Sequence, residues 1–238
     1  NDKLITAAEA VGKIKNQDTI TIAGFVGTCV PDELLHALRE RFIKEQTPNN
    51  LTLLFSAGPG DGKERGINLL AFPKLLKRVV GGHFGLIPKI SELALKDEIE
   101  AYNIPQGLIS HLYRDIASGK PGVLTKVGLG TFADPRIEGG KVNKSSTEDL
   151  IELINIKDEE YLFVPTFPID IAILRGSVAD KNGSISMRNE ALLIDNLAQA
   201  MATKNSGGIV IFQVEQVIQD LLPSRQVDIP AGLVDFLV

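Results

Sequence analysis

The chain has 238 residues, 44% of them hydrophobic, so it can bury a sizeable core as one large domain or two small ones. Its net charge of −5 gives no electrostatic reason to expect nucleic acid or a membrane surface as a partner, and its apolar runs are far shorter than the roughly 20 residues of a membrane span. A single cysteine excludes an internal disulfide, and the first residues lack the pattern of a signal peptide, so we expect a cytoplasmic protein.

Short runs rich in β-branched residues alternate along the chain with amphipathic segments. The first kind predicts strands at 19–24, 50–58, 78–85, 99–105, 161–165, 170–177 and 207–215. The second kind predicts helices at 31–43, 88–98, 106–118 and 190–204. Because the strand segments are continuous apolar runs, we predict an α/β fold whose mostly parallel sheet is covered by helices on both faces.

Glycines cluster directly after the predicted strands, at positions 24, 58, 81–82, 107 and 128. In an open parallel sheet, ligands bind outside the carboxyl ends of the strands, and glycine lets a ligand approach the backbone closely. Tight turns use glycine as well, so each of these positions has a structural interpretation beside the functional one.

The first of these turns, in the stretch GFVGTCVPDELL, joins a predicted strand to a predicted helix. Pro31 suits the first helical position, and Gly24 and Gly27 leave backbone N–H groups unshielded just before it. Such a turn can hold an anionic oxygen. Cys29 is either a nucleophile paired with a distant histidine or a small buried apolar residue, and we favour the second interpretation.

The segment 119–147 is rich in glycine and long for a connection, which is typical of functional or mobile loops. Within it, GLGTFA at 128–133 matches a dinucleotide-binding pattern, but that motif has to open a helix. Pro135 and the Gly139–Gly140 pair follow and disfavour one, so we predict no nucleotide site there. The three histidines are far apart in sequence and there is no second cysteine, so we predict no metal site.

The last residues, GLVDFLV, form an apolar run without a turn, a cap or a polar tail. An unpaired strand edge invites association, so we expect a second half of the chain or a second subunit to pair here.

Five stretches, in this order and spacing, closely resemble the N-terminal half of family I CoA-transferases: GFVGTCVPDELL, SAGPGDGKERG, GGHFGLIPKISELA, EAYNIPQGLISHLYRDIASGKPGVLTKVGLGTFADPR and GGKVN. The nearest resemblance is to the fused acetate/propionate CoA-transferases, and the succinyl-CoA:3-ketoacid transferases are more distant. The resemblance implies a three-layer open α/β fold, with residues 1–225 as the half that shapes the acid pocket. Residues 226–238 would begin the connection to, or the pairing with, a missing C-terminal half.

The resemblance also implies ping-pong chemistry through a glutamyl-CoA thioester on a glutamate of the other half, so no catalytic residue is expected in this chain. Six residues are expected to contribute to the substrate pocket: Gly24, Gly27, His83, Gln106, Gly128 and Gly130. Gln106 falls on the family's glutamine near the bound carboxylate, although a residue at a helix start can also satisfy a local backbone group. For His83 a structural hydrogen-bonding role is an equal alternative.

The resemblance predicts a CoA-transferase that uses coenzyme A as a substrate, with no cofactor and no metal. Its expected partners are a C-terminal half, fused or separate, an acyl-CoA, a short-chain carboxylic acid and further copies of itself. A sugar-phosphate isomerase is an alternative, but we find none of the clustered acid–base residues or phosphate anchors that it needs. A ligand-sensing regulatory domain would fit the pocket but not the apolar C-terminal edge.

Overall fold

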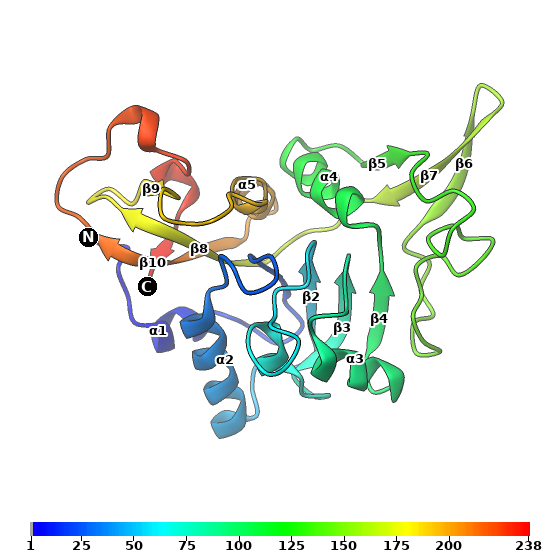
Figure 1. The fold of residues 1–238 in the computed structure, drawn as a ribbon, viewed down its shortest axis with the longest axis horizontal. Coiled ribbons are helices and arrows are strands. Elements are labelled where there is room, and N and C mark those ends of the chain that lie inside the picture. The colour runs from blue at the N-terminus through cyan, green and yellow to red at the C-terminus, as the bar shows by residue number, and fades with distance from the viewer. Residues whose placement is uncertain (1) are drawn as a thin grey trace.

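The computed structural model describes residues 2–238, which form a mixed α/β structure (Figure 1). Its helices are α1 (Ala7–Val11), α2 (Asp32–Glu45), α3 (Pro88–Leu95), α4 (Gln106–Ala117) and α5 (Asn196–Asn205). Its strands are β1 (Thr19–Ile22), β2 (Leu51–Phe55), β3 (Leu76–Gly81), β4 (Glu100–Asn103), β5 (Gly122–Thr125), β6 (Glu152–Ile156), β7 (Glu159–Pro165), β8 (Ile171–Ala179), β9 (Ile185–Ser186), β10 (Ile209–Val217) and β11 (Phe236–Leu237). Every predicted helix and strand is present, with shifts at the ends.

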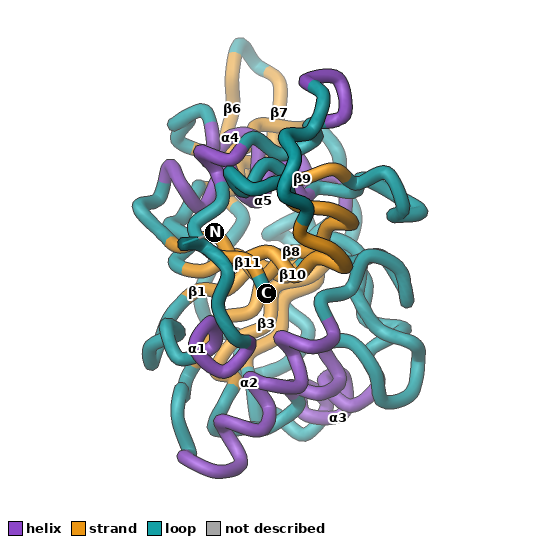
Figure 2. Tube along the Cα trace, turned by 90° about the vertical axis from the view of Figure 1, so that its left-hand side faces the viewer, coloured by secondary structure: helices purple, strands orange, loops and turns teal. Residues whose placement is uncertain are grey.

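The main sheet has the strand order β11-β10-β8-β1-β2-β3-β4, and all neighbours along this path run parallel. The short β9 is the exception, because it pairs antiparallel with β8. Helices α1, α2 and α3 lie on one side of the sheet, and α4 and α5 lie on the other (Figure 2). The predicted three-layer, mostly parallel α/β fold is therefore confirmed.

The helix layers bury the apolar stripes that the sequence predicts. On α2, Leu34, Leu35, Leu38 and Phe42 are each at most 4% exposed and join the core cluster between the sheet and the layer of α1, α2 and α3. Their spacing of three and four residues places them on one face of the helix. Removing the side chain of one such leucine costs about 2–5 kcal/mol of folding free energy.

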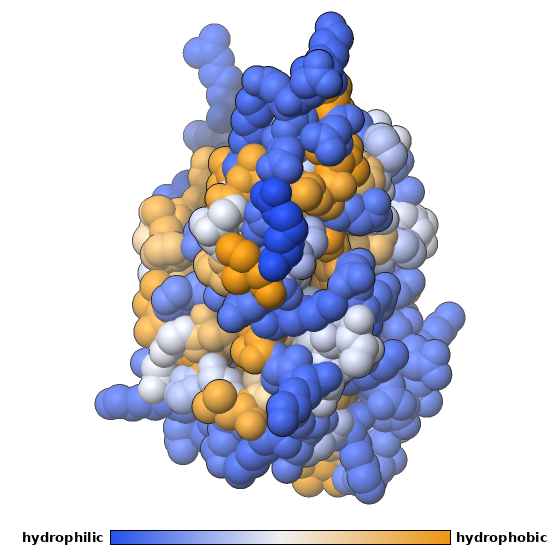
Figure 3. Space-filling model, turned by 90° about the vertical axis from the view of Figure 1, so that its right-hand side faces the viewer, coloured by the Kyte–Doolittle hydropathy of each residue, from blue (hydrophilic) through white to orange (hydrophobic). Residues whose placement is uncertain are grey.

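A second, antiparallel sheet has the order β5-β7-β6 and was not predicted as separate from the main one. Only β7, at 161–165, was predicted as a strand. The residues of β6 are exposed or half-buried, so they form no continuous apolar run, and β5 lies inside the glycine-rich segment. Figure 3 views the molecule from the side of this sheet, where apolar side chains are interspersed with hydrophilic ones.

The last residues are paired within the chain. Strand β11 lies parallel to β10, and on its other side the Leu237 N–H donates to the Lys3 carbonyl while the Ile5 N–H donates to the Leu237 carbonyl, at 2.8 and 2.9 Å. The expectation of an unpaired edge at GLVDFLV is therefore wrong, because the N-terminal residues cover it. The division of the chain at residue 225 stays a prediction.

Candidate functional site

The carboxyl ends of four strands meet at one edge of the sheet, because β1, β2, β3 and β4 run parallel and side by side. The chain leaves this edge through turns that carry three of the six residues predicted to bind substrate, Gly24, Gly27 and His83, and Gln106 directly follows the last turn. These turns span residues 23–31, 56–66, 82–87 and 104–105. Ligands of open parallel sheets bind at such an edge, so the turns define the candidate site.

Glycines bring the first three turns into contact. A Cβ atom added to Gly24, whose φ is +129°, would lie 2.6 Å from the Cβ of Pro59 in the turn after β2. In the same way, Gly58 lies directly against the backbone carbonyl of His83, in the turn after β3. No larger residue fits at either glycine without displacing a neighbouring turn. The turns of Gly24 and His83 therefore both pack against the turn after β2, which lies between them.

Gln106 is the first residue of α4 and is exposed at this edge. A Cβ atom on Gly82 would lie 2.7 Å from its Cα and 2.8 Å from its Cβ, and it would also meet the backbone carbonyl of Ser56. The start of α4 thus packs directly on the turns after β2 and β3. This position fits a role in binding a carboxylate, which stays a prediction.

The first turn reverses at Val26 and Gly27. Phe25 and Thr28 exchange two backbone hydrogen bonds of 3.0 Å around them, and the Gly60 N–H donates to the Val26 carbonyl at 2.8 Å. Val26 has a φ of +57°, a strained conformation for a β-branched residue. Gly27 is exposed and a Cβ atom there would have no neighbour within 4 Å. The fold therefore leaves space at Gly27, where a ligand could approach the backbone.

The first N–H groups of α2 are already occupied by a side chain of the protein, whereas the sequence-based prediction concerned the N–H groups of Gly24 and Gly27 before the helix. Pro31 precedes the helix, but the N–H groups of Glu33 and Leu34 donate to Oε1 of Gln213 on β10, at 3.0 and 3.4 Å. A side-chain oxygen from a distant strand already satisfies these donors. Within this turn, only the segment before the helix remains as a candidate for ligand contact.

Gly128 and Gly130 lie in the loop between β5 and β6, apart from the other predicted residues. Their φ angles are +102° and +72°, and the Gly130 N–H donates to the Asp134 carboxylate at 2.9 Å, so the turn itself requires glycine. The loop reaches the site edge through Asn103, whose N–H donates to the Gly140 carbonyl at 2.7 Å at the end of β4. The structure thus links the loop of these glycines to β4, the strand before Gln106.

The Asp134 carboxylate holds this loop together. Besides the Gly130 N–H, it accepts hydrogen bonds from the backbone N–H and the guanidinium of Arg136, at 2.8 to 3.0 Å. The side chain of Arg136 is the main cause that lowers the pKa of Asp134 well below its usual range. Part of the segment 119–147, which was predicted to be functional or mobile, is therefore held by its own ion pair between Asp134 and Arg136. The same segment also contains strand β5.

Cys29 is buried, at 4% exposure, behind the first turn. Its sulfur accepts a hydrogen bond from the amide of Asn196 at 3.4 Å and faces the Arg175 carbonyl at 3.7 Å. Burial raises the pKa of this thiol to about 12. A thiol that stays protonated at neutral pH is a poor nucleophile, so the geometry favours the small buried residue over the nucleophile.

Asp195 belongs to the same edge and was not among the residues predicted from sequence. Its carboxylate is buried directly before α5 and accepts hydrogen bonds from Ser56 Oγ at 3.0 Å, Ser110 Oγ at 2.7 Å and Arg114 Nη1 at 3.2 Å. An aspartate before a helix usually suggests an N-cap, but this side chain makes no capping hydrogen bond. No local pattern could have revealed its real partners, because they come from the turn after β2 and from α4.

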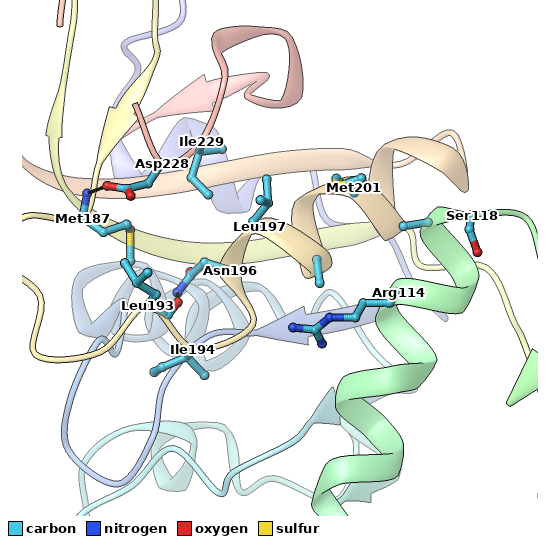
Figure 4. A pocket seen from close by; sticks show the side chains of 12 residues that line it. Arg114, Ser118, Met187, Leu193, Ile194, Asn196, Leu197, Met201, Asp228 and Ile229 are labelled. Carbon is cyan, nitrogen blue, oxygen red and sulfur yellow. Dashed lines mark hydrogen bonds between the residues drawn. The ribbon is translucent and has the colours of Figure 1, made fainter. Parts of the chain in front are cut away.

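A groove of about 460 Å³ lies between the C-terminal half of α4 and α5 (Figure 4). Its walls are mostly apolar, with Leu193, Leu197 and Met201 among them, and Arg114 extends from α4 toward the start of α5. None of the six residues predicted from sequence lines it. The groove adjoins the Asp195 cluster through Arg114 but does not belong to the predicted pocket.

Within residues 2–238 no cluster of three or more histidine, cysteine, aspartate or glutamate side chains is arranged to hold a metal ion. Over the same residues, no helix combines the length and the apolar character needed to cross a bilayer.

Comparison with known proteins identifies the family. The model of the Coenzyme A transferase family matches residues 4–238. A caffeate CoA-transferase of Acetobacterium woodii is 44% identical over 237 residues, which cover 99% of this chain and 45% of that protein. The acetoacetyl-CoA:acetate/butyrate CoA transferase alpha subunit of Clostridium acetobutylicum is 28% identical over 239 residues, covering 100% of this chain and 98% of that subunit.

Among solved structures, the apoenzyme of the acyl-CoA transferase YdiF from Escherichia coli O157:H7 superimposes with a TM-score of 0.96 at 38% identity, covering 98% of this chain and 46% of that one. The chain therefore belongs to the coenzyme A transferase family, as the sequence motifs indicated. It spans about half the length of caffeate CoA-transferase and of YdiF. This family match does not favour the isomerase or the sensor alternative.

Proposed function

We propose that the chain is the acid-binding half of an acyl-CoA:carboxylate CoA-transferase. The match of residues 4–238 to the coenzyme A transferase family carries this proposal. The relatives named caffeate CoA-transferase and acetoacetyl-CoA:acetate/butyrate CoA transferase alpha subunit support it, because both names describe CoA transfer that involves a carboxylic acid. We further propose that the complete enzyme contains a C-terminal half, fused or separate, and assembles into a homo-oligomer in the cytoplasm.

The proposed reaction proceeds in two matched half-reactions. A glutamate carboxylate of the C-terminal half attacks the thioester carbonyl of the acyl-CoA and displaces the CoA thiolate, which leaves a mixed anhydride. The thiolate then attacks the glutamyl carbonyl, releases the first acid and forms a glutamyl-CoA thioester. The acceptor acid reverses these steps and leaves as its CoA thioester, so the thioester energy is conserved. Coenzyme A is a substrate, and the proposal includes no cofactor.

In this scheme the chain binds the acid at the carboxyl edge of its sheet. The amide of Gln106 donates a hydrogen bond to the carboxylate, and the open backbone at Gly27 lets the substrate approach the first turn. His83 and the loop of Gly128 and Gly130 border this pocket as further proposed contacts. Acetate, propionate and acetoacetate define the proposed acid class, and caffeate is the alternative that the Acetobacterium relative suggests.

The test combines the chain with a C-terminal half, for which that of the caffeate CoA-transferase is a substitute if needed. Acetyl-CoA is supplied with labelled propionate, acetoacetate or caffeate, and labelled acyl-CoA is measured. We expect transfer by the combined halves and none by the 238-residue chain alone. Turnover by the chain alone would contradict the proposed division of labour, and absence of transfer to every acid would overturn the function.

A further inference from the structure

Asp195 joins three parts of the candidate site through one buried and two partly buried hydrogen bonds. It is 7% exposed and lies before α5. Ser56 reaches it from the end of β2, and Ser110 and Arg114 reach it from α4. A carboxylate accepts on both oxygens and donates on neither, so it can receive all three donors at once. An asparagine of the same shape would present an N–H₂ group to at least one of them.

Two partners of Asp195 lie next to the elements that position Gln106: Ser110 on the same helix, and Ser56 in the turn after β2. Ser110 is four residues after Gln106, one turn along the same face of α4. Ser56 lies in the turn whose carbonyl packs, together with the start of α4, around Gly82. Asp195 therefore connects the helix that carries Gln106 with the turn on which that residue rests.

We propose that Asp195 is a positioning residue that holds the first turn of α4 against the turns after β2 and β3, and thereby places the Gln106 amide for the carboxylate. This inference rests on the proposed role of Gln106. Asp195 itself makes no substrate contact, because its oxygens are buried and occupied by the chain's own donors. Its neighbour Asn196 holds Cys29 and the first turn in a similar way, so the start of α5 contacts several parts of the edge.

The kinetic test uses the complete enzyme and Asp195→Asn, with Asp180→Asn as the matched control. Asp180 is another buried carboxylate, at 2% exposure, which accepts hydrogen bonds from backbone N–H groups in the turn after β8. We expect Asp195→Asn to raise the KM for the acid about tenfold while the formation of glutamyl-CoA from acyl-CoA keeps its rate. In a Gln106→Ala background the same change has no further effect on that KM, since it acts through Gln106. Asp180→Asn lowers stability without raising the KM for the acid.

Hydrogen exchange provides a readout that needs no enzymatic activity. The N–H groups of Leu108 and Ile109 donate to the Pro105 carbonyl in the first turn of α4. We expect Asp195→Asn to accelerate the exchange of these two amides about tenfold, while the amides of β8 stay protected. Ser110→Ala, which removes one partner of Asp195, is the second variant in case Asp195→Asn does not fold.

The outcomes are distinct. Unchanged exchange at Leu108 and Ile109 overturns the positioning role, and so do additive effects of Asp195→Asn and Gln106→Ala on the KM for the acid. An equal loss in both half-reactions, or the same acid defect in Asp180→Asn, also overturns it, because a general loss of structure would produce either. A wild-type enzyme without any transfer activity contradicts the proposed function instead. In that case the hydrogen-exchange result by itself tests whether Asp195 positions α4.

Discussion

Replacing Gly24 or Gly27 by alanine separates what the fold requires from what the substrate requires. At Gly24 the φ of +129° strains any other residue by about 1–3 kcal/mol. The added Cβ atom would also lie 2.6 Å from Pro59 and 2.9 Å from Val30, and such overpacking costs about 1–3 kcal/mol more. We therefore expect Gly24→Ala to lose about 2–6 kcal/mol of unfolding free energy.

At Gly27 neither cost applies. Its φ lies outside the left-handed region and a Cβ atom would have no neighbour within 4 Å, so Gly27→Ala gains about 0.4–1 kcal/mol by restricting the unfolded chain. If the substrate approaches the backbone here, the methyl group obstructs it and lowers the transfer rate constant kcat/KM about tenfold. A variant that is more stable but less active is the expected result.

Urea unfolding measures the stability of both variants, and coupled CoA transfer by the complete enzyme measures their activity. Gly232→Ala is the control, because Gly232 is also exposed, without a neighbour for a Cβ atom, and remote from the predicted pocket. A stability loss in Gly27→Ala as large as in Gly24→Ala would refute the conformational argument. Unchanged transfer by a well-folded Gly27→Ala would remove Gly27 from the site.

Two further substitutions test the remaining predictions. Gln106→Ala should raise the KM for the acid several-fold, because it removes a hydrogen bond worth about 1 kcal/mol. Gln106→Glu should raise this KM more, because its negative charge repels the carboxylate. Unchanged acid kinetics in both variants would exclude Gln106 from the pocket. Cys29→Ala and Cys29→Ser should keep most of the activity, and inactivity of a folded Cys29→Ala would show that the thiol takes part. Because the pKa of Cys29 is raised from 9.0 to about 12, the native state keeps a proton that the unfolded state loses between these values, so stability should fall with pH there and fall less in Cys29→Ala.

The sequence predicted the fold well wherever the signal was local and strong. The sequence shows β2, β8 and β10 as continuous apolar runs, and it shows α2 through apolar residues spaced three and four apart. These patterns are visible in the sequence because the apolar residues face the core. Strands β5 and β6 were missed for the opposite reason. Their side chains are largely exposed or half-buried, and their pairing depends on β7, which lies between them in the sheet.

The candidate site was less predictable, because its decisive contacts are distant in sequence. The topology of a parallel sheet alone explains why turns that carry Gly24, His83 and Gln106 meet at one edge. The sequence could not show that Ser56 donates a hydrogen bond to Asp195, which is 139 residues further along the chain. It also could not show that Gln213 accepts a hydrogen bond from Glu33 at the start of α2, 180 residues away. The first contact was therefore missed, and the second limits the predicted anion contact to the turn before the helix, where it stays a prediction.

The charges around this edge suggest why the proposed pocket relies on a neutral amide. Arg114 on α4 is paired with Asp195 at 3.2 Å, and Arg65, after the turn of Gly60, is paired with Asp32 at 2.8 Å. An acid bound directly to such an arginine would share its negative charge with the guanidinium, and its oxygen would attack the glutamyl-CoA carbonyl less readily. With these arginines paired to aspartates, a neutral donor such as Gln106 would, in the proposed pocket, orient one oxygen of the acid without neutralising its charge. The pairing of Arg114 with Asp195 would then serve the chemistry as well as the placement of the helix.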